Sequence, residues 1–436
     1  MSKHSANRRE SAPTPHEPRI LILSASVGAG HIRAAQALAL TFKDRLPQTT
    51  VEHVDVLELT NAAFRKGYRD GYFSLVKHAP NVVGMLYDKL DKPNPKNLGT
   101  QARLRFERTN FGKLSKLLRQ EPSWDLVVST HFLPPQMIAH LRKRETIHCP
   151  QVIVVTDYDV QGMWLHEPCE AYFVSNPEAK VYLDKLGIDP QIVHATGIPI
   201  DPVFTKSKDR NECRRELGFD VNRPLILQMS GGLGIGPAEQ IYRSLREDVT
   251  VPAQICVVAG KNTKLKSALE AHGPDSRHDC KVMGFTDKVD ELMTAADMII
   301  TKPGGLTTSE ALARGCPMVI IDPIPGQEER NSDFLLENGC AIKPSHPEKT
   351  LGYRVNELLK HPARLHQMQK SARRCSHPEA ARDVVDQCIA LLNARARAPG
   401  VSQSQEQLSD AEESASANRR RRMKLPSLRS TGRRKK

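Results

Sequence analysis

The chain has 436 residues, of which 39% are apolar, 26% charged and 5% aromatic, and this composition suits two globular domains with tails. No apolar run approaches the roughly 18 residues that a spanning helix needs, which excludes a membrane-embedded protein. Ten of the Lys and Arg residues behind the net charge of +13 fall in 419–436, where no acidic residue occurs, so the rest of the chain lacks the strong basicity of a nucleic-acid-binding domain.

Both ends of the chain are predicted to be disordered. Residues 1–18 hold no apolar segment, so we also expect no cleaved secretory signal. Residues 396–436 are polar and then basic, and they bury too little apolar surface to offset the entropy of ordering. The basic block suits anionic lipid, nucleic acid or no dedicated partner. The nine cysteines include no CxxC pair, which favours reduced thiols and a cytoplasmic location.

Short β-branched runs alternate with stretches of helical periodicity from Arg19 onward. Continuous apolar strands joined by helices are typical of parallel sheets covered on both faces. The strands predicted in the first set are 19–24, 51–56, 125–129, 151–156, 171–175 and 191–196. The strands predicted in the second set are 224–229, 253–259, 280–284, 297–301 and 317–322.

The segment between the two sets, residues 197–217, is rich in Pro, Gly and charge and is predicted to be an interdomain linker. We therefore expect two doubly wound, Rossmann-like α/β domains, at 19–200 and 201–395. Ligands of such folds bind at the carboxyl ends of the strands, so the two domains are expected to share a cleft.

A glycine turn follows the first strand in the sequence SASVGAGH, residues 24–31. Gly28 and Gly30 are expected to permit unusual backbone angles and to let a ligand approach a helix N-terminus, where free N–H groups favour anions. Arg33 occupies the third position of a dinucleotide-binding GxGxxG pattern and argues against a dehydrogenase. His31 is a candidate general base at the start of the helix, with capping or packing of the turn as the alternative.

A second glycine loop, QMSGGLGIGP at 228–237, follows a strand and includes Gly231 and Gly232. Its amides suit a phosphate-binding nest, and a flexible connector is the alternative.

The segment 301–331 carries the most specific pattern. Pro303, Gly304 and Gly305 open a helix directly after a strand, so its amides, with the hydroxyls of Thr307 and Thr308, are expected to face a diphosphate. Glu310, further along this helix, suits both hydroxyls of a ribose, or else is a solvated helix residue. The following loop, PGQEERN at 325–331, clusters amides and carboxylates suited to a sugar.

These residues are similar to a known family. The chain resembles the processive diacylglycerol glucosyltransferases and monogalactosyldiacylglycerol synthases, nucleotide-sugar enzymes of the glycosyltransferase B fold, over about residues 19–390. The segments that carry the resemblance are SASVGAGH (24–31), TDYDVQGMW (156–164), YFVSNPEA (172–179), GFTDKVDELMTAADMIITKPGGLTTSEALARG (284–315) and PGQEERN (325–331).

The resemblance implies roles for particular residues. It makes His31 the general base. It assigns nucleotide binding to Pro303, Gly304, Gly305 and Glu310, and hexose binding to Gln327, Glu328 and Asn331. Asp157 and Asp159 end a strand and are candidates for orienting the acceptor or the base, with capping as the alternative, and His131 is a weaker candidate.

The activity implied is inverting transfer of a hexose from UDP-glucose or UDP-galactose to diacylglycerol or a glycosyl-diacylglycerol in an anionic membrane. We expect no metal and no cofactor, because the UDP-sugar is a substrate and helix amides stabilise the leaving group. We also expect no nucleic-acid partner and a peripheral location at the inner face of the cell membrane. A nucleotide-sugar epimerase of the same fold, or a transferase to another lipid, is the alternative.

A water-insoluble acceptor requires a surface that contacts the bilayer. Residues 64–87 include five aromatic residues with basic residues between them, which suits an interfacial helix, with an amphipathic core helix as the alternative. We predict that Phe64, Tyr68, Tyr72 and Phe73 face the acceptor or the membrane. Residues 101–119 are also basic, and there an amphipathic core helix is favoured over a lipid-binding one.

Overall fold

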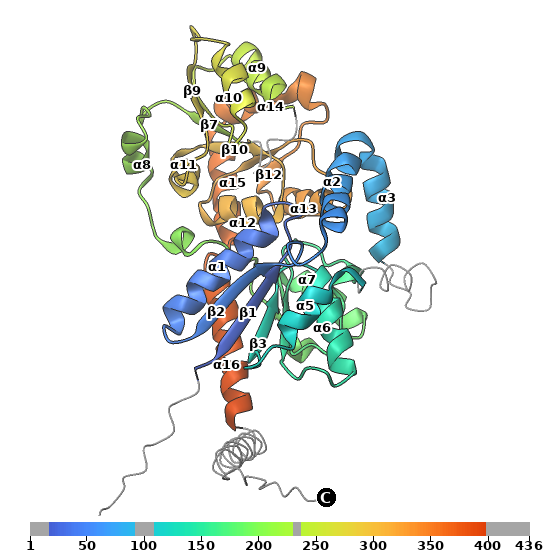
Figure 1. Cartoon of the computed structure of the whole chain (residues 1–436). Coiled ribbons are helices and arrows are strands. Elements are labelled where there is room, and N and C mark those ends of the chain that lie inside the picture. The colour runs from blue at the N-terminus through green and yellow to red at the C-terminus, as the bar shows by residue number, and fades with distance from the viewer. Residues whose placement is uncertain (1–16, 92–108, 230–236, 398–436) are drawn as a thin grey trace, which may run out of the picture. The chain divides into compact units, whose positions relative to one another are not determined.

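A computed structural model describes residues 17–91, 109–229 and 237–397 of the chain (Figure 1). Residues up to Val385 form one compact unit that holds both sheets, and a second unit begins at Asp386. Almost all of the two segments predicted to be disordered lies outside the described residues.

The first sheet has six parallel strands in the order β2-β1-β3-β4-β5-β6. These strands are β1 (Arg19–Ser24), β2 (Thr50–Asp55), β3 (Leu126–Ser129), β4 (Gln151–Val154), β5 (Ala171–Val174) and β6 (Val193–Ala195). Ile20 to Leu23 are fully buried, because helices cover both faces of the sheet. In Figure 1, α1 (Gly30–Arg45) lies on one side of this sheet, and α5 (Gly112–Leu118) and α6 (Leu133–Lys143) lie on the other.

The second sheet also has six parallel strands, in the order β12-β11-β10-β7-β8-β9. Its strands are β7 (Leu225–Met229), β8 (Gln254–Val258), β9 (Asp279–Met283), β10 (Met298–Thr301), β11 (Met318–Ile320) and β12 (Ala341–Ile342). Strand β12 was not predicted, because two residues are too few to show an alternating pattern. Each sheet reverses its strand order once, between β1 and β3 and between β7 and β10, where such folds bind ligands.

The remaining helices connect the strands. In the first half of the chain they are α2 (Ala62–His78), α3 (Pro80–Asp91), η1 (Gly162–Trp164), α7 (Pro177–Lys185) and η2 (Pro190–Ile192). In the second half they are η3 (Pro202–Thr205), α8 (Arg210–Glu216), α9 (Ala238–Asp248), α10 (Thr263–Glu270), α11 (Val289–Ala295), α12 (Gly305–Ala313), α13 (Gln327–Glu337), α14 (Pro347–Lys360), α15 (Pro362–Arg374) and α16 (Ala380–Arg397). None of the helices in the described parts of the chain is long and apolar enough to cross a bilayer.

The segment predicted to be a linker is packed instead. It contains η3 and α8, and Phe204, Cys213 and Leu217 are buried in the core of the second sheet. Its charged residues gave it the composition of a linker, but Arg214 is 5% exposed and pairs with Asp297 at 2.7 Å.

The structure corrects the prediction that the aromatic residues at 64–87 form one interfacial helix. They are divided between α2 and α3, and Phe64 is 8% exposed in the core beneath the first sheet. Its ring stacks on Tyr68 at 5.6 Å and meets Phe111 edge-on at 5.8 Å. Phe64 and Tyr68 therefore anchor α2 to the protein, since helical spacing alone does not show whether an aromatic stripe faces a core or a membrane.

The prediction for residues 101–119 agrees with the structure where the chain is described. Residues 101–108 lie outside the described residues. The remainder includes α5, whose Leu114 and Leu118 are buried, as expected for an amphipathic core helix.

Candidate active site

His31 is the second residue of α1, the helix that follows β1 in the chain. Its Nδ1 lies 3.0 Å from the carbonyl oxygen of Thr130 and 2.7 Å from the hydroxyl oxygen of Thr156. A carbonyl oxygen can only accept, so Nδ1 carries the hydrogen and Nε2 keeps its lone pair. Burial lowers the pKa of His31 to about 4, opposed by the hydrogen bond to Thr130. The half-buried imidazole is therefore neutral at pH 7 and presents an unprotonated nitrogen.

Aromatic rings surround His31 on one side. The ring of His131 lies 4.5 Å from it in a T-shaped arrangement, and the ring of Trp164 lies at 6.4 Å. His131 accepts a hydrogen bond from the amide of Leu133 through Nδ1, and burial, with His31 as a lesser cause, lowers its pKa well below the ordinary value. His131 is thus a neutral neighbour of the candidate base.

The helices α1 and α12 begin next to each other. A Cβ added to Gly30 would lie 3.6 Å from Leu306 Cδ2, in the first turn of α12. Neither helix has a side-chain cap or an acidic residue in its first turn, an arrangement that suits an anion. Gly28 has a φ of +91°, whereas Gly30 is not in the left-handed region, which corrects the expectation for Gly30.

The turn 303–305 is placed as predicted, at the start of α12 after β10. We call the parts of the chain around the first and second sheets the first and second lobes. Gly304 is the residue before the helix, and Gly305 is buried against the first lobe. A Cβ on Gly305 would lie 2.1 Å from the carbonyl oxygen of Thr156, so only glycine permits this approach. Thr307 is half-buried, but Thr308 is fully buried, so its hydroxyl does not face an open site as predicted.

Glu310 is 1% exposed, which excludes the alternative of a solvated helix residue. Both of its carboxylate oxygens accept hydrogen bonds from the guanidinium of Arg33. Burial raises the pKa of Glu310 to about 7, although Arg33 opposes this shift. Because the carboxyl is buried as well as paired with Arg33, a ribose could reach Glu310 only if the residues that cover it moved aside.

The residues predicted for the hexose lie at the start of α13. The Oε2 of Glu328 accepts the amide of Ile324 at 2.8 Å, and its Oε1 lies 3.7 Å from the Cβ position of Gly304. The loop at 325–331, called the hexose loop below, therefore lies next to the start of α12. Asn331 is fully buried and its amide is engaged at both ends: Oδ1 accepts from the amide of Tyr158 at 2.9 Å, and Nδ2 donates to Pro303 at 3.0 Å. Asn331 therefore joins the two lobes of the chain and is not open to a sugar as predicted.

Asp157 also faces the hexose loop. Burial raises its pKa to about 7, while hydrogen bonds from Gln327 and Asn331 lower it. Its partners place it beside the predicted hexose residues, whereas the hydrogen-bond partners of His31 Nδ1 are Thr130 and Thr156. Asp159 lies 3.9 Å from Arg330. Among the described residues, no three His, Cys, Asp or Glu side chains cluster to hold a metal ion.

Some predicted residues are placed differently or cannot be placed. Tyr72 is half-buried, and burial raises its pKa, with the charges of Glu328 and Asp157 as lesser causes. Gly231 and Gly232 lie outside the described residues, and the side chain of Phe73 is not described.

Comparison with known proteins identifies the family. Residues 31–200 match the family described as monogalactosyldiacylglycerol (MGDG) synthase, and residues 210–375 match glycosyl transferases group 1. The chain is 30% identical over 357 residues to the processive diacylglycerol beta-glucosyltransferase of Bacillus subtilis (strain 168), covering 81% of this chain and 90% of that relative. The chain belongs to the processive diacylglycerol glucosyltransferase family. A protein of the same name from Bacillus cereus (strain AH187) is 28% identical over 86% of this chain and 94% of its own.

Solved structures support the fold. The S. aureus MnaA-UDP co-structure matches with a TM-score of 0.57 at 16% identity, covering 86% of this chain and 97% of that one. The crystal structure of Acinetobacter baumannii MurG matches with a TM-score of 0.51 at 17% identity, covering 85% and 99%. The predicted family and the glycosyltransferase B fold are confirmed. The family relatives are transferases, so the epimerase alternative is not favoured.

Three residues of this glycosyltransferase that touch the site were not predicted from the sequence. Arg33 was considered only as an argument against a dehydrogenase, and its pairing with Glu310 has no local sequence signal. Thr156 and Tyr158 belong to the TDYD segment, where only the two aspartates were considered. Their signal was position, because residues that follow a strand lie at the carboxyl edge of the sheet.

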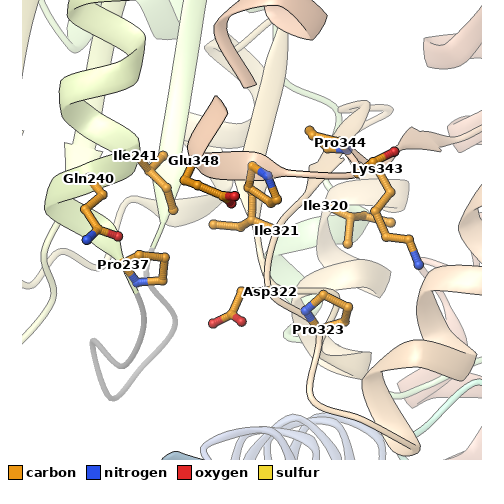
Figure 2. Close-up of a pocket in the computed structure, with 12 residues that line it drawn as sticks. Pro237, Gln240, Ile241, Ile320, Ile321, Asp322, Pro323, Lys343, Pro344 and Glu348 are labelled. Carbon is orange, nitrogen blue, oxygen red and sulfur yellow. The ribbon is translucent and has the colours of Figure 1, made fainter. Parts of the chain in front are cut away.

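A cavity of about 440 Å³ lies elsewhere, at the carboxyl ends of β11 and β12 (Figure 2). Ile241, Asp322, Lys343 and Glu348 are among the residues that line it, and its walls come from α9, α14 and the loops after the two strands. None of the predicted site residues that the structure describes lines this cavity.

Proposed function

We propose that this glycosyltransferase moves a hexose from a UDP-sugar to the free hydroxyl of diacylglycerol, or of a glycosyl-diacylglycerol, and forms a β-glycoside. The observation that carries the proposal is the juxtaposition of two uncapped helix N-termini with a neutral imidazole in the first turn of one of them. The names of the relatives support the acceptor.

His31 is the general base of this reaction. Its Nε2 takes the proton of the acceptor hydroxyl as the oxygen attacks the anomeric carbon. The new carbon–oxygen bond forms while the bond to the diphosphate breaks on the opposite face, which inverts the configuration. The departing diphosphate gains negative charge, and the free amides at the start of α12 stabilise that charge most in the transition state. The scheme needs neither a metal nor a cofactor.

The donor is a UDP-hexose. Structures bound to UDP among the matches support a uridine nucleotide. The relatives are named glucosyltransferases, and one matching family is named for a galactolipid synthase. UDP-glucose and UDP-galactose are therefore the two donors to compare in the activity test below. Gln327 and Glu328 bind the hexose in this proposal, whereas Asn331 acts by holding the loop at 325–331 in place.

The acceptor requires a membrane, and α2 and α3 offer a revised surface for it. Leu75, Val82 and Met85 are exposed on these helices, with Met85 63% exposed, and Arg65 and Lys66 lie on α2. We expect this surface to bind anionic bilayers peripherally.

The activity test incubates the purified chain with diacylglycerol vesicles and each labelled nucleotide sugar, followed by analysis of the lipid extract. The wild-type chain should form a glycolipid, and His31→Ala should reduce the rate by roughly 10²–10⁴, the usual contribution of a positioned base. The exposed His361, changed to Ala, is the control and should retain activity. Full activity in the His31 variant would remove the base, and a wild-type chain inactive with every donor would refute the function.

The membrane test measures sedimentation with vesicles that contain an anionic lipid. Met85→Ser should weaken binding, and Tyr353→Ser, which changes another exposed apolar residue, should not. Equal binding by both variants would place the membrane surface elsewhere.

A further inference from the structure

Thr156 lies two residues beyond the end of β4 and is 4% exposed. Its hydroxyl oxygen is 2.7 Å from Nδ1 of His31. Because Nδ1 already carries a hydrogen for the carbonyl oxygen of Thr130, the hydroxyl of Thr156 is a second acceptor for that same hydrogen. The hydroxyl of Thr130 donates to the carbonyl oxygen of His31 at 2.9 Å, which fixes the backbone of the base. The imidazole is thus held through Nδ1, and Nε2 is left for the acceptor.

The backbone of Thr156 faces the other lobe of the chain. Its carbonyl oxygen lies against Gly305, where even a methyl group would come within 2.1 Å. Two residues on, the hydroxyl of Tyr158 hydrogen-bonds the hydroxyl of Ser309 in α12 at 3.0 Å. The side chain of Thr156 therefore touches the base, while its backbone touches the helix that is expected to hold the leaving group.

We propose that Thr156 is a positioning residue that holds the imidazole of His31 in its reactive orientation and sets the distance between the base and the first turn of α12. This inference rests on the proposed function, because it assumes that His31 acts as a base and that α12 binds the diphosphate. It adds to that function a residue that touches neither substrate.

The effect of Thr156 is greatest in the transition state. As Nε2 takes the proton of the acceptor hydroxyl, the imidazole becomes positively charged, and its Nδ1–H bonds to Thr130 and Thr156 become charge-assisted and stronger. An interaction that strengthens only as charge develops raises kcat without changing how tightly the donor binds in the ground state.

The test compares Thr156→Val, which keeps the shape and removes the hydroxyl, with Thr156→Ser, which restores the hydroxyl. The Val variant should lose roughly tenfold or more in kcat, a part of the 10²–10⁴ that a positioned base contributes, with the KM for the UDP-sugar unchanged. The Ser variant should recover most of the loss. Thr41→Val is the matched control. Thr41 is also buried, lies within α1, and donates to the carbonyl oxygen of Ala37 in the same helix at 2.8 Å.

Three outcomes would overturn the proposal. The first is a Val variant with wild-type kcat. The second is a Val variant that Ser does not rescue and that raises KM and lowers the thermal midpoint together, as a purely structural residue would. The third is a wild-type chain that makes no glycolipid, which refutes the function as well and so differs from the first two. If the Val variant does not fold, Thr156→Ala with the same readouts takes its place.

Discussion

Replacement of Glu310 by Gln tests the electrostatics of the site. The carboxyl is almost completely buried, and burial raises its pKa from 4.5 to about 7 even with Arg33 beside it. The native state therefore keeps a proton on Glu310 between pH 4.5 and 7 that the unfolded chain has released, so stability falls as pH rises through this window. Each tenfold change in proton affinity is worth about 1.4 kcal/mol, so ionised Glu310 costs the native state about 3 kcal/mol at pH 8.

Glutamine resembles the protonated acid and carries no such cost. The Gln variant should exceed the wild type in free energy of unfolding by less than about 1 kcal/mol at pH 5 and by about 3 kcal/mol at pH 8. Urea denaturation followed by circular dichroism at both pH values measures this difference. The exposed Glu270, changed to Gln, is the control and should leave the pH dependence of the wild type in place.

The same variant separates stability from function. If Glu310 binds the ribose, Glu310→Gln should weaken UDP binding while it stabilises the fold at pH 8, and isothermal titration measures that affinity. A variant whose pH dependence of unfolding equals that of the wild type would show that Glu310 ionises without cost and would refute the electrostatic argument.

Two further predictions concern packing. Phe64→Ala should lower the free energy of unfolding by about 3 kcal/mol, as expected for a buried aromatic residue. The control Leu75→Ala, at an exposed position, should leave it nearly unchanged. If urea denaturation gave the larger loss for Leu75→Ala, Phe64 would not be a core residue. Gly326→Ala should lower the thermal midpoint more than Gly273→Ala. Both glycines have positive φ, but only at 326 would the new Cβ lie 2.6 Å from Tyr87 Cγ. Equal losses would show that the ring of Tyr87 moves aside without cost.

The strands were predictable because their sequence pattern is local. A buried parallel strand is a run of β-branched and apolar residues, as in Ile20 to Leu23, and all eleven predicted strands overlap observed ones. Because all strands of a sheet run parallel, every residue that follows a strand lies at the same edge of its sheet. For this reason His31 and the turn at 303–305 could be placed from the sequence.

The partners of these residues were not predictable in the same way. Nothing within α1 shows that Arg33 meets Glu310, because the two residues are 277 positions apart. Phe64 shows the same limit, since a helical aromatic stripe has one pattern whether a core or a bilayer covers it. Asn331 was assigned to the sugar because its amide suits hydroxyl groups, but an amide suits backbone groups equally well, and backbone groups of both lobes occupy it.

The missing side chain of Gly305 matters in two ways. The sequence predicts that the amides at the start of this helix face a diphosphate, and a bare backbone lets an anion reach them. The same absence lets the carbonyl oxygen of Thr156 approach α12, and Thr156 in turn holds His31. Any side chain at 305 would therefore push Thr156 away from α12 and disturb its contact with His31. Under the proposed function, this one glycine couples donor binding to the placement of the base without any further residue.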